Sequence, residues 1–101
     1  MEEEAFKVFS GPEANLNQVQ IIECGLREMP KLKYVKHTLK VLRLNNNQIA
    51  AVERDYFENM AKLSIVEIAG NLLTEMPNFI PLCNVLNTLR METNFLTDLG
   101  K

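Results

Sequence analysis

The side chains that could carry out chemistry are few, and their spacing does not assemble a catalytic site. The single histidine, His37, has no serine, cysteine or acidic residue at a spacing typical of a triad or a metal site. Glu28 and Glu75 each precede a methionine and a proline, but they lie too far apart for a paired-carboxylate mechanism. The chain has no glycine-rich phosphate-binding motif. We therefore expect no enzymatic activity, no metal site and no cofactor, and a surface position for His37.

The elements that must position any functional side chain follow from an internal repeat. Residues 39–49 have the pattern L-x-x-L-x-L-x-x-N-x-I. The same spacing returns at 63–73 and 86–96, and in a weaker form at 16–26, so that successive copies begin 23, 24 and 23 positions apart. A fixed period of this length is typical of architectures in which each unit packs mainly on its neighbours. Each copy predicts a short strand followed by a tight turn that an asparagine closes.

The period divides the chain into one domain with a short N-terminal segment. Residues 1–15 are expected to form a tail and a capping strand, because residues 5–9 alternate apolar and polar types; a flexible tail is the alternative. Residues 53–60 contain enough helix formers for one or two helical turns on the outer side. The four predicted units are 16–38, 39–62, 63–85 and 86–101, of which the last is truncated.

Four copies in register resemble the leucine-rich-repeat family, and specifically its typical class with roughly 23–24 residues per unit. The resemblance covers nearly all of residues 16–101. It implies an α/β solenoid with a short, curved parallel sheet on the concave side and irregular, 3-10 or short helical segments on the convex side. It also implies a non-catalytic recognition module that binds a protein through its concave face, as in extracellular and immune-receptor proteins of this class. The chain lacks the cysteine-rich caps of those relatives.

Parallel strands send alternate side chains to opposite faces, so each predicted strand has core residues and concave residues. In the middle column, Arg43 lies between Gln20 and Glu67 in the expected sheet, and Arg90 follows Glu67. Opposite charges on neighbouring strands can pair across a sheet, at about 0.2–1 kcal/mol per pair. The column either keeps the sheet soluble or forms a recognition strip of mixed charge. The candidate binding residues are Gln18, Gln20, Ile22, Val41, Arg43, Asn45, Ile65, Glu67, Ala69, Thr88, Arg90 and Glu92.

One position in each unit is expected to join neighbouring turns by hydrogen bonds. An asparagine there can donate and accept, whereas a cysteine supplies only a weak donor. We expect Cys24 to be a buried, small apolar side chain and the first unit to be chemically poorer. Cys24 and Cys83 should be free thiols, because strands about 4.8 Å apart separate them by more than the disulfide limit of about 7 Å. The expected structural ladder consists of Cys24, Asn47, Asn71 and Asn94.

Charge and hydropathy narrow the class of partner. The net charge of −2 gives no basic field for nucleic acid, and no apolar run approaches the ~20 residues of a membrane span. A basic cluster at residues 31–40 could attract an anion, but a solvated outer face is the simpler interpretation. The acidic N-terminus does not resemble a signal peptide and there is no N-glycosylation sequon, so a cytoplasmic location stays open although the repeat class favours an extracellular one.

A second function is compatible with the same repeats. Leu96 and Leu99 finish the last copy with no polar cap after them. An uncapped end of a repeat stack exposes apolar surface, which favours association with another molecule. The alternative expectation is therefore a structural, self-associating fragment that forms a homodimer through its C-terminal repeat.

Overall fold

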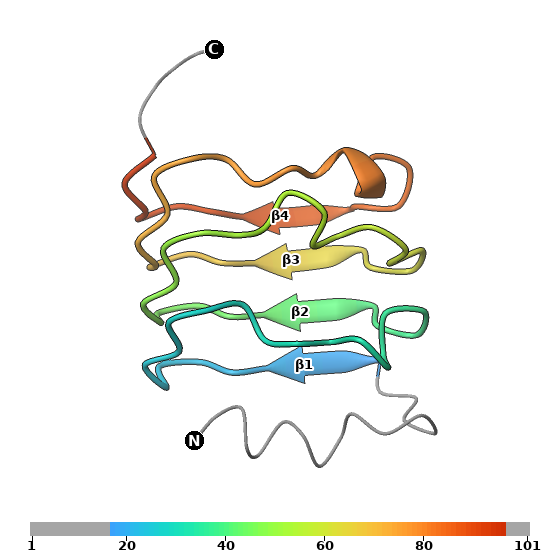
Figure 1. The fold of residues 1–101 in the computed structure, drawn as a ribbon, viewed down its shortest axis with the longest axis horizontal. Helices are drawn as coiled ribbons and strands as arrows, with labels where there is room; N and C mark the ends of the chain where they lie inside the picture. The colour runs from blue at the N-terminus through green and yellow to red at the C-terminus, as the bar shows by residue number, and fades with distance from the viewer. Residues whose placement is uncertain (1–16, 97–101) are drawn as a thin grey trace.

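The computed structural model of the chain describes residues 17–96 and contains a four-stranded parallel sheet (Figure 1). The order in the sheet is β1-β2-β3-β4, and equivalent repeat positions are in register, as between Leu42 and Val66. The predicted parallel sheet is thus confirmed. The predicted capping strand, and the beginning and end of the first and last units, lie outside the described residues. The strands are β1 (Gln18–Gln20), β2 (Val41–Arg43), β3 (Ile65–Glu67) and β4 (Thr88–Arg90).

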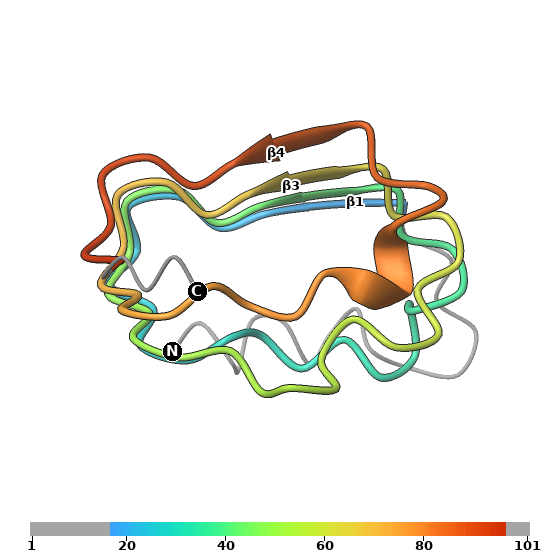
Figure 2. The ribbon, with the colours of Figure 1, turned by 90° about the horizontal axis from the view of Figure 1, so that it is seen from above.

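The described chain forms two layers. Figure 2 shows the sheet as one layer, with the segments that return from each strand to the next lying along one of its faces. No segment within residues 17–96 covers the opposite face, which we call the open face. Strands as short as three residues gain little from their own ladder, so the sheet depends on apolar contacts between the two layers.

The core lies between these layers and follows the repeat. Leu42 and Leu44 are fully buried, and so are Val66 and Ile68 at the equivalent positions of the next strand. In the return segments, Phe57 and Met60 are buried as well. The Phe57 ring also packs against Phe79, with 5.2 Å between the ring centroids. Side chains of successive units therefore stack into one continuous apolar core.

The return segments contain almost no helix. The prediction of helical turns at 53–60 is wrong: Tyr56 N–H donates to Glu53 O at 3.0 Å, and the chain forms isolated turns. Asn59 has a φ of +68°, which no continuing helix allows. A helix this short has an unfavourable nucleus, and packing of apolar side chains onto the core decides the conformation instead. The only helix among the described residues is η1 (Ile80–Leu82), a 3-10 turn. No helix within residues 17–96 is long and apolar enough to cross a bilayer.

Three asparagines join neighbouring units by hydrogen bonds. Asn71 Oδ1 accepts from the Ile49 N–H at 3.0 Å, and its amide donates to the Leu44 carbonyl at 2.9 Å. Asn47 makes the equivalent bonds to the unit before it, and Asn94 makes them to the unit that contains Asn71. We call these three asparagines the asparagine rungs. Each rung satisfies backbone groups of the preceding unit, which would otherwise be buried without partners.

Cys24 differs from the prediction, because it is exposed and not buried. Its thiol donates only to the Ile22 carbonyl within the same unit, at 3.3 Å. An asparagine rung is buried by the unit it reaches back to, and residues 17–96 contain no unit before the one that holds Cys24. Cys83 is also an exposed, free thiol.

Candidate functional site

The alternation along each strand places the twelve candidate binding residues on the open face. In β2 and β3 the central residue is buried, while Val41, Arg43, Ile65 and Glu67 on either side are half-buried. Gln18 and Gln20 of β1 are exposed, and so is Arg90 of β4. The remaining candidates, Ile22, Asn45, Ala69, Thr88 and Glu92, continue the same rows with intermediate or full exposure.

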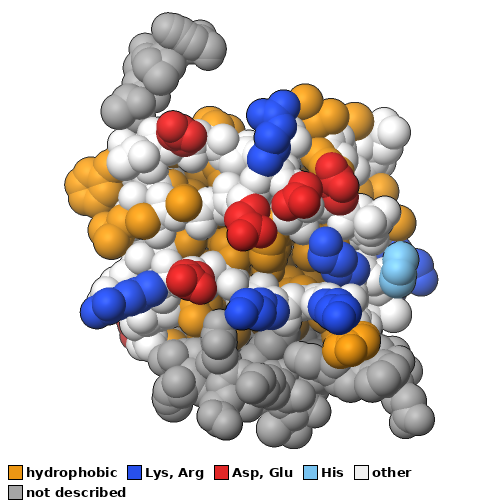
Figure 3. All heavy atoms as spheres, viewed as in Figure 1, with side chains coloured by type: hydrophobic (Ala, Val, Ile, Leu, Met, Phe, Trp, Pro, Cys, Tyr) orange, Lys and Arg blue, Asp and Glu red, His pale blue; other side chains and the backbone are white. Residues whose placement is uncertain are grey.

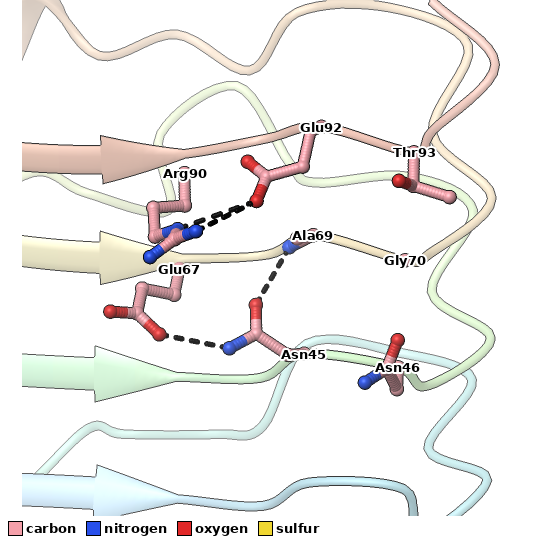
Figure 4. A pocket seen from close by; sticks show the side chains of 8 residues that line it. All are labelled: Asn45, Asn46, Glu67, Ala69, Gly70, Arg90, Glu92 and Thr93. Carbon is pink, nitrogen blue, oxygen red and sulfur yellow. Dashed lines mark hydrogen bonds and ion pairs between the residues drawn. The ribbon is translucent and has the colours of Figure 1, made fainter.

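A depression of about 410 Å³ lies on the open face, where β2, β3 and β4 run into their turns (Figure 4). Five of the predicted residues meet there: Asn45, Glu67, Ala69, Arg90 and Glu92. Three further residues complete the wall, and the sequence interpretation did not include them. These are Asn46, Gly70 and Thr93.

The three additional residues share an unusual backbone conformation. Asn46, Gly70 and Thr93 have φ angles of +62°, +71° and +62°, and Glu23 occupies the same position in the first unit with +58°. Glycine and asparagine tolerate this left-handed region, whereas a β-branched threonine is strained there. The repeat spacing puts all four residues in one column directly after the candidate binding residues. An Asn and a Gly at equivalent turn positions were the signal that could have identified them.

The charged residues of the depression take part in two ion pairs, Arg43–Glu67 and Arg90–Glu92. Arg43 Nε lies 3.3 Å from Glu67 Oε2, so the expected pair across β2 and β3 forms. The Asn45 amide also donates to Glu67 Oε1 at 2.9 Å, and Asn45 Oδ1 accepts from the Ala69 N–H at 2.9 Å. Glu67 is therefore held on two sides, and its side chain is only 14% exposed.

Arg90 does not extend the pairing across the sheet in the same way. Although Arg90 is in register with Glu67, its guanidinium pairs with Glu92 of its own chain segment, at 3.2 Å. The two oxygens of Glu67 have Asn45 and Arg43 as partners, and the Arg90 guanidinium lies beside Glu92 instead. A hydrogen bond from its own backbone N–H, together with Arg90, holds the pKa of Glu92 below its usual value. The Arg90–Glu92 pair is well exposed to solvent.

The basic cluster at residues 31–40 lies away from the open face. Figure 3 shows the face that carries the return segments, where Lys and Arg side chains gather beside the first of them and acidic side chains lie over the middle. Lys36 Nζ donates to the Glu58 carbonyl at 3.3 Å, and Lys33 lies over the Tyr34 ring.

Within residues 17–96, no three His, Cys, Asp or Glu side chains come together as metal ligands would.

The chain matches no protein-family model, no curated protein sequence and no solved structure at a significant level.

Proposed function

We propose that the chain is a leucine-rich-repeat solenoid that binds a protein partner, without catalysis, through the open face of its sheet. In such a solenoid the open face corresponds to the concave side. Support comes from the order of the strands, the equivalent register of the four units and the asparagine rungs between them. These features are what a stack of like units requires.

The observation that carries the proposed function is the depression on the open face. It draws residues from β3, from β4 and from the turns that follow β2, β3 and β4, and its polar groups include both charges and uncharged amides. Hydrogen bonds hold several of these side chains in place, from Asn45 to Glu67 and from Arg90 to Glu92. This favours recognition, because little conformational entropy is lost when a partner binds.

The chemistry of the face indicates a partner with both apolar and charged side chains. Val41 and Ile65 are adjacent in register and half-buried, so a partner can still cover them. The Arg43–Glu67 pair lies two residues further along the same strands, and Glu67 lines the depression. An extended polypeptide segment that runs along the strands can place apolar side chains on the first pair and polar groups in the depression. Apolar contact supplies affinity, at about 25 cal/mol per Å² buried, and the charged groups supply specificity.

A selection of displayed peptides on the purified chain tests this proposal. We expect selected peptides to lose binding to Ala69→Arg, because the added side chain fills the depression. Ala51→Arg makes the same chemical change at an exposed position of a return segment and should leave binding intact. Peptides that bind both variants equally well would contradict the assignment of the open face as the binding surface.

One observation favours self-association as a second function. Leu89 occupies the core position of β4 but is 38% exposed, whereas Leu42 and Val66 at the equivalent positions are 0% exposed. The stack thus presents apolar surface at its β4 end. Light scattering over a range of concentrations tests self-association, which predicts an average molar mass that rises with concentration. A monomer mass at every concentration would contradict it.

A further inference from the structure

The depression on the open face forms where one unit of the stack has small residues between two units with larger ones. Its middle consists of Ala69 and Gly70, which belong to a unit with a described neighbour on each side. Figure 4 shows that the equivalent positions of the flanking units carry longer side chains, namely Asn45, Asn46, Glu92 and Thr93. With a volume of about 410 Å³, the depression can take one long side chain of a partner.

The residues that line the depression carry an excess of negative charge. Glu67 and Glu92 are carboxylates, whereas Arg90 is the one cation among the described residues that line it. Arg43 pairs with Glu67 from outside this lining. Two nitrogens of Arg90 donate to a single oxygen, Glu92 Oε2, at 3.2 and 3.3 Å. A basic side chain of a partner therefore meets opposite net charge, whereas an acidic one meets like charge, which disfavours binding.

Two polar side chains of the lining have no hydrogen-bond partner within residues 17–96. These are the Asn46 amide, whose oxygen extends over Gly70, and the Thr93 hydroxyl. Both oxygens can accept a hydrogen bond, and the lysine and arginine head groups carry donors only. A basic side chain thus matches the free acceptors as well as the charge, whereas an apolar side chain would cover them without a partner.

A second anchor for a partner lies on the same strands. Val41 and Ile65 form a half-buried apolar pair on the open face. Ile65 lies four residues before Ala69, and the hydrogen bonds between these two units continue that far, since the Asn46 N–H donates to the Ala69 carbonyl at 2.8 Å. At about 3.3 Å per residue, the apolar pair and the depression are about 13 Å apart.

This distance determines the spacing of two anchoring side chains in an extended partner. Side chains on one face of an extended segment recur every two residues, with the same rise as the strands beneath. Residues i and i+4 of such a segment therefore reach the apolar pair and the depression. Residue i+2 lies over the Arg43–Glu67 pair, whose charges already satisfy each other. A helical partner rises about 1.5 Å per residue and would need about nine residues for the same distance.

We propose that the depression binds a lysine or arginine side chain of an extended partner segment, four residues from an apolar side chain that covers Val41 and Ile65. The inference rests on the proposed function, in which the open face binds a protein, and adds the chemistry and the spacing of the two anchors. Arg90 opposes the incoming charge, so its removal distinguishes a basic from an acidic partner.

The displayed peptides selected on the purified chain test the spacing. We expect enrichment of a basic residue four positions from an apolar one, and the order of the two reports the direction of the peptide along the strands. Inserting one threonine between the two anchors should weaken binding roughly tenfold or more, because the anchors then point to opposite faces. The same insertion outside the anchors is the control. Selected peptides without a basic residue, or with another preferred spacing, overturn the proposal.

Charge variants of the chain test the sign of the anchor. For a selected peptide, Arg90→Gln should lower the dissociation constant roughly threefold or more, and Glu92→Gln should raise it by a similar factor. Glutamine in place of the basic residue of the peptide should remove both effects. Arg54→Gln and Glu75→Gln make the same charge changes at exposed positions of the return segments and should change binding less than about twofold. Fluorescence anisotropy measures these constants, and weaker binding to Arg90→Gln would contradict a basic anchor.

The outcomes separate this inference from the function on which it rests. Peptides that lose binding to Ala69→Arg and show the expected response to both charge variants support the inference. Peptides that lose binding to Ala69→Arg but do not respond to Arg90→Gln or Glu92→Gln overturn the basic anchor and leave the open face as the binding surface. Peptides that bind Ala69→Arg as well as the wild type overturn both.

Discussion

The side chain of Asn46 fills the space that a β-carbon on Gly70 would need. Both residues belong to the column of left-handed residues that lines the depression, with Gly70 at a φ of +71°. Gly25 also has a positive φ, of +73°, but nothing lies within 4 Å of the position of its β-carbon. The two glycines thus share a backbone requirement and differ in steric surroundings.

Gly70→Ala is expected to destabilise the fold more than Gly25→Ala. The Gly25 change involves only the left-handed backbone, about 1–2 kcal/mol, whereas at Gly70 the Asn46 side chain must also move. Chemical denaturation of the two variants measures the difference. Equal losses would mean that Asn46 adjusts without cost. The double variant Gly70→Ala/Asn46→Gly, which removes the obstructing side chain, should bring the Gly70 loss close to the Gly25 loss.

Asn71→Leu should cost roughly 2–5 kcal/mol, because the Ile49 N–H and the Leu44 carbonyl lose a partner in the buried core. Asn94→Leu is the graded comparison: Asn94 makes equivalent bonds but is only half-buried, so its loss should be smaller. Cys24→Asn should be neutral or slightly stabilising, within about 0.5 kcal/mol. Urea denaturation measures all three, and an unchanged midpoint for Asn71→Leu would contradict its role as a rung.

Tyr56 connects two return segments through a hydrogen bond from its hydroxyl to the Pro30 carbonyl. Tyr56→Phe should therefore cost about 0.5–1.5 kcal/mol at neutral pH. Burial, with a smaller effect of Glu53, raises the pKa of the Tyr56 hydroxyl. A raised pKa in the folded state gives stability that is present below the unfolded pKa of about 10 and is lost as pH rises above it. As pH rises above about 10, the melting temperature of the wild type should fall more than that of Tyr56→Phe, which thermal denaturation measures. Equal falls in melting temperature would argue against the buried hydroxyl.

Glu92 should titrate below the usual range of a glutamate, first because of its backbone N–H and then because of Arg90. A lowered pKa gives stability that is present above the unfolded pKa of about 4.3 and is lost as pH falls through the folded pKa. Arg90→Gln should raise the Glu92 pKa only in part, since the backbone hydrogen bond remains. NMR titration of the carboxyl carbon measures this change, with Arg43→Gln as the control, because Arg43 pairs with Glu67 and not with Glu92. A Glu92 pKa that responds equally to both substitutions would contradict this pairing.

The fold was predictable to the extent that it is periodic. Leucines at fixed offsets indicate which residues face the core, and Leu42 and Leu44 are buried as that pattern requires. The conformation of residues 53–60 was not predictable in the same way. The helix propensity of a short segment is weak compared with the packing of Phe57 and Met60, so the expected helical turns do not form. Thr93 gave no signal either, since its residue type argues against the left-handed conformation that its place in the repeat imposes.

The sequence by itself determined the strand positions, the inward and outward faces and the positions of the asparagine rungs, because each depends on a spacing that recurs in every unit. The tertiary structure decided which polar groups meet. Arg90 pairs with Glu92 and not with Glu67, whose two oxygens have Arg43 and Asn45 of the preceding unit as partners. The same holds for Cys24 and Leu89, which are exposed because burial at a repeat position requires a neighbouring unit to cover it. Periodicity describes one unit, whereas exposure and pairing depend on which units lie beside it.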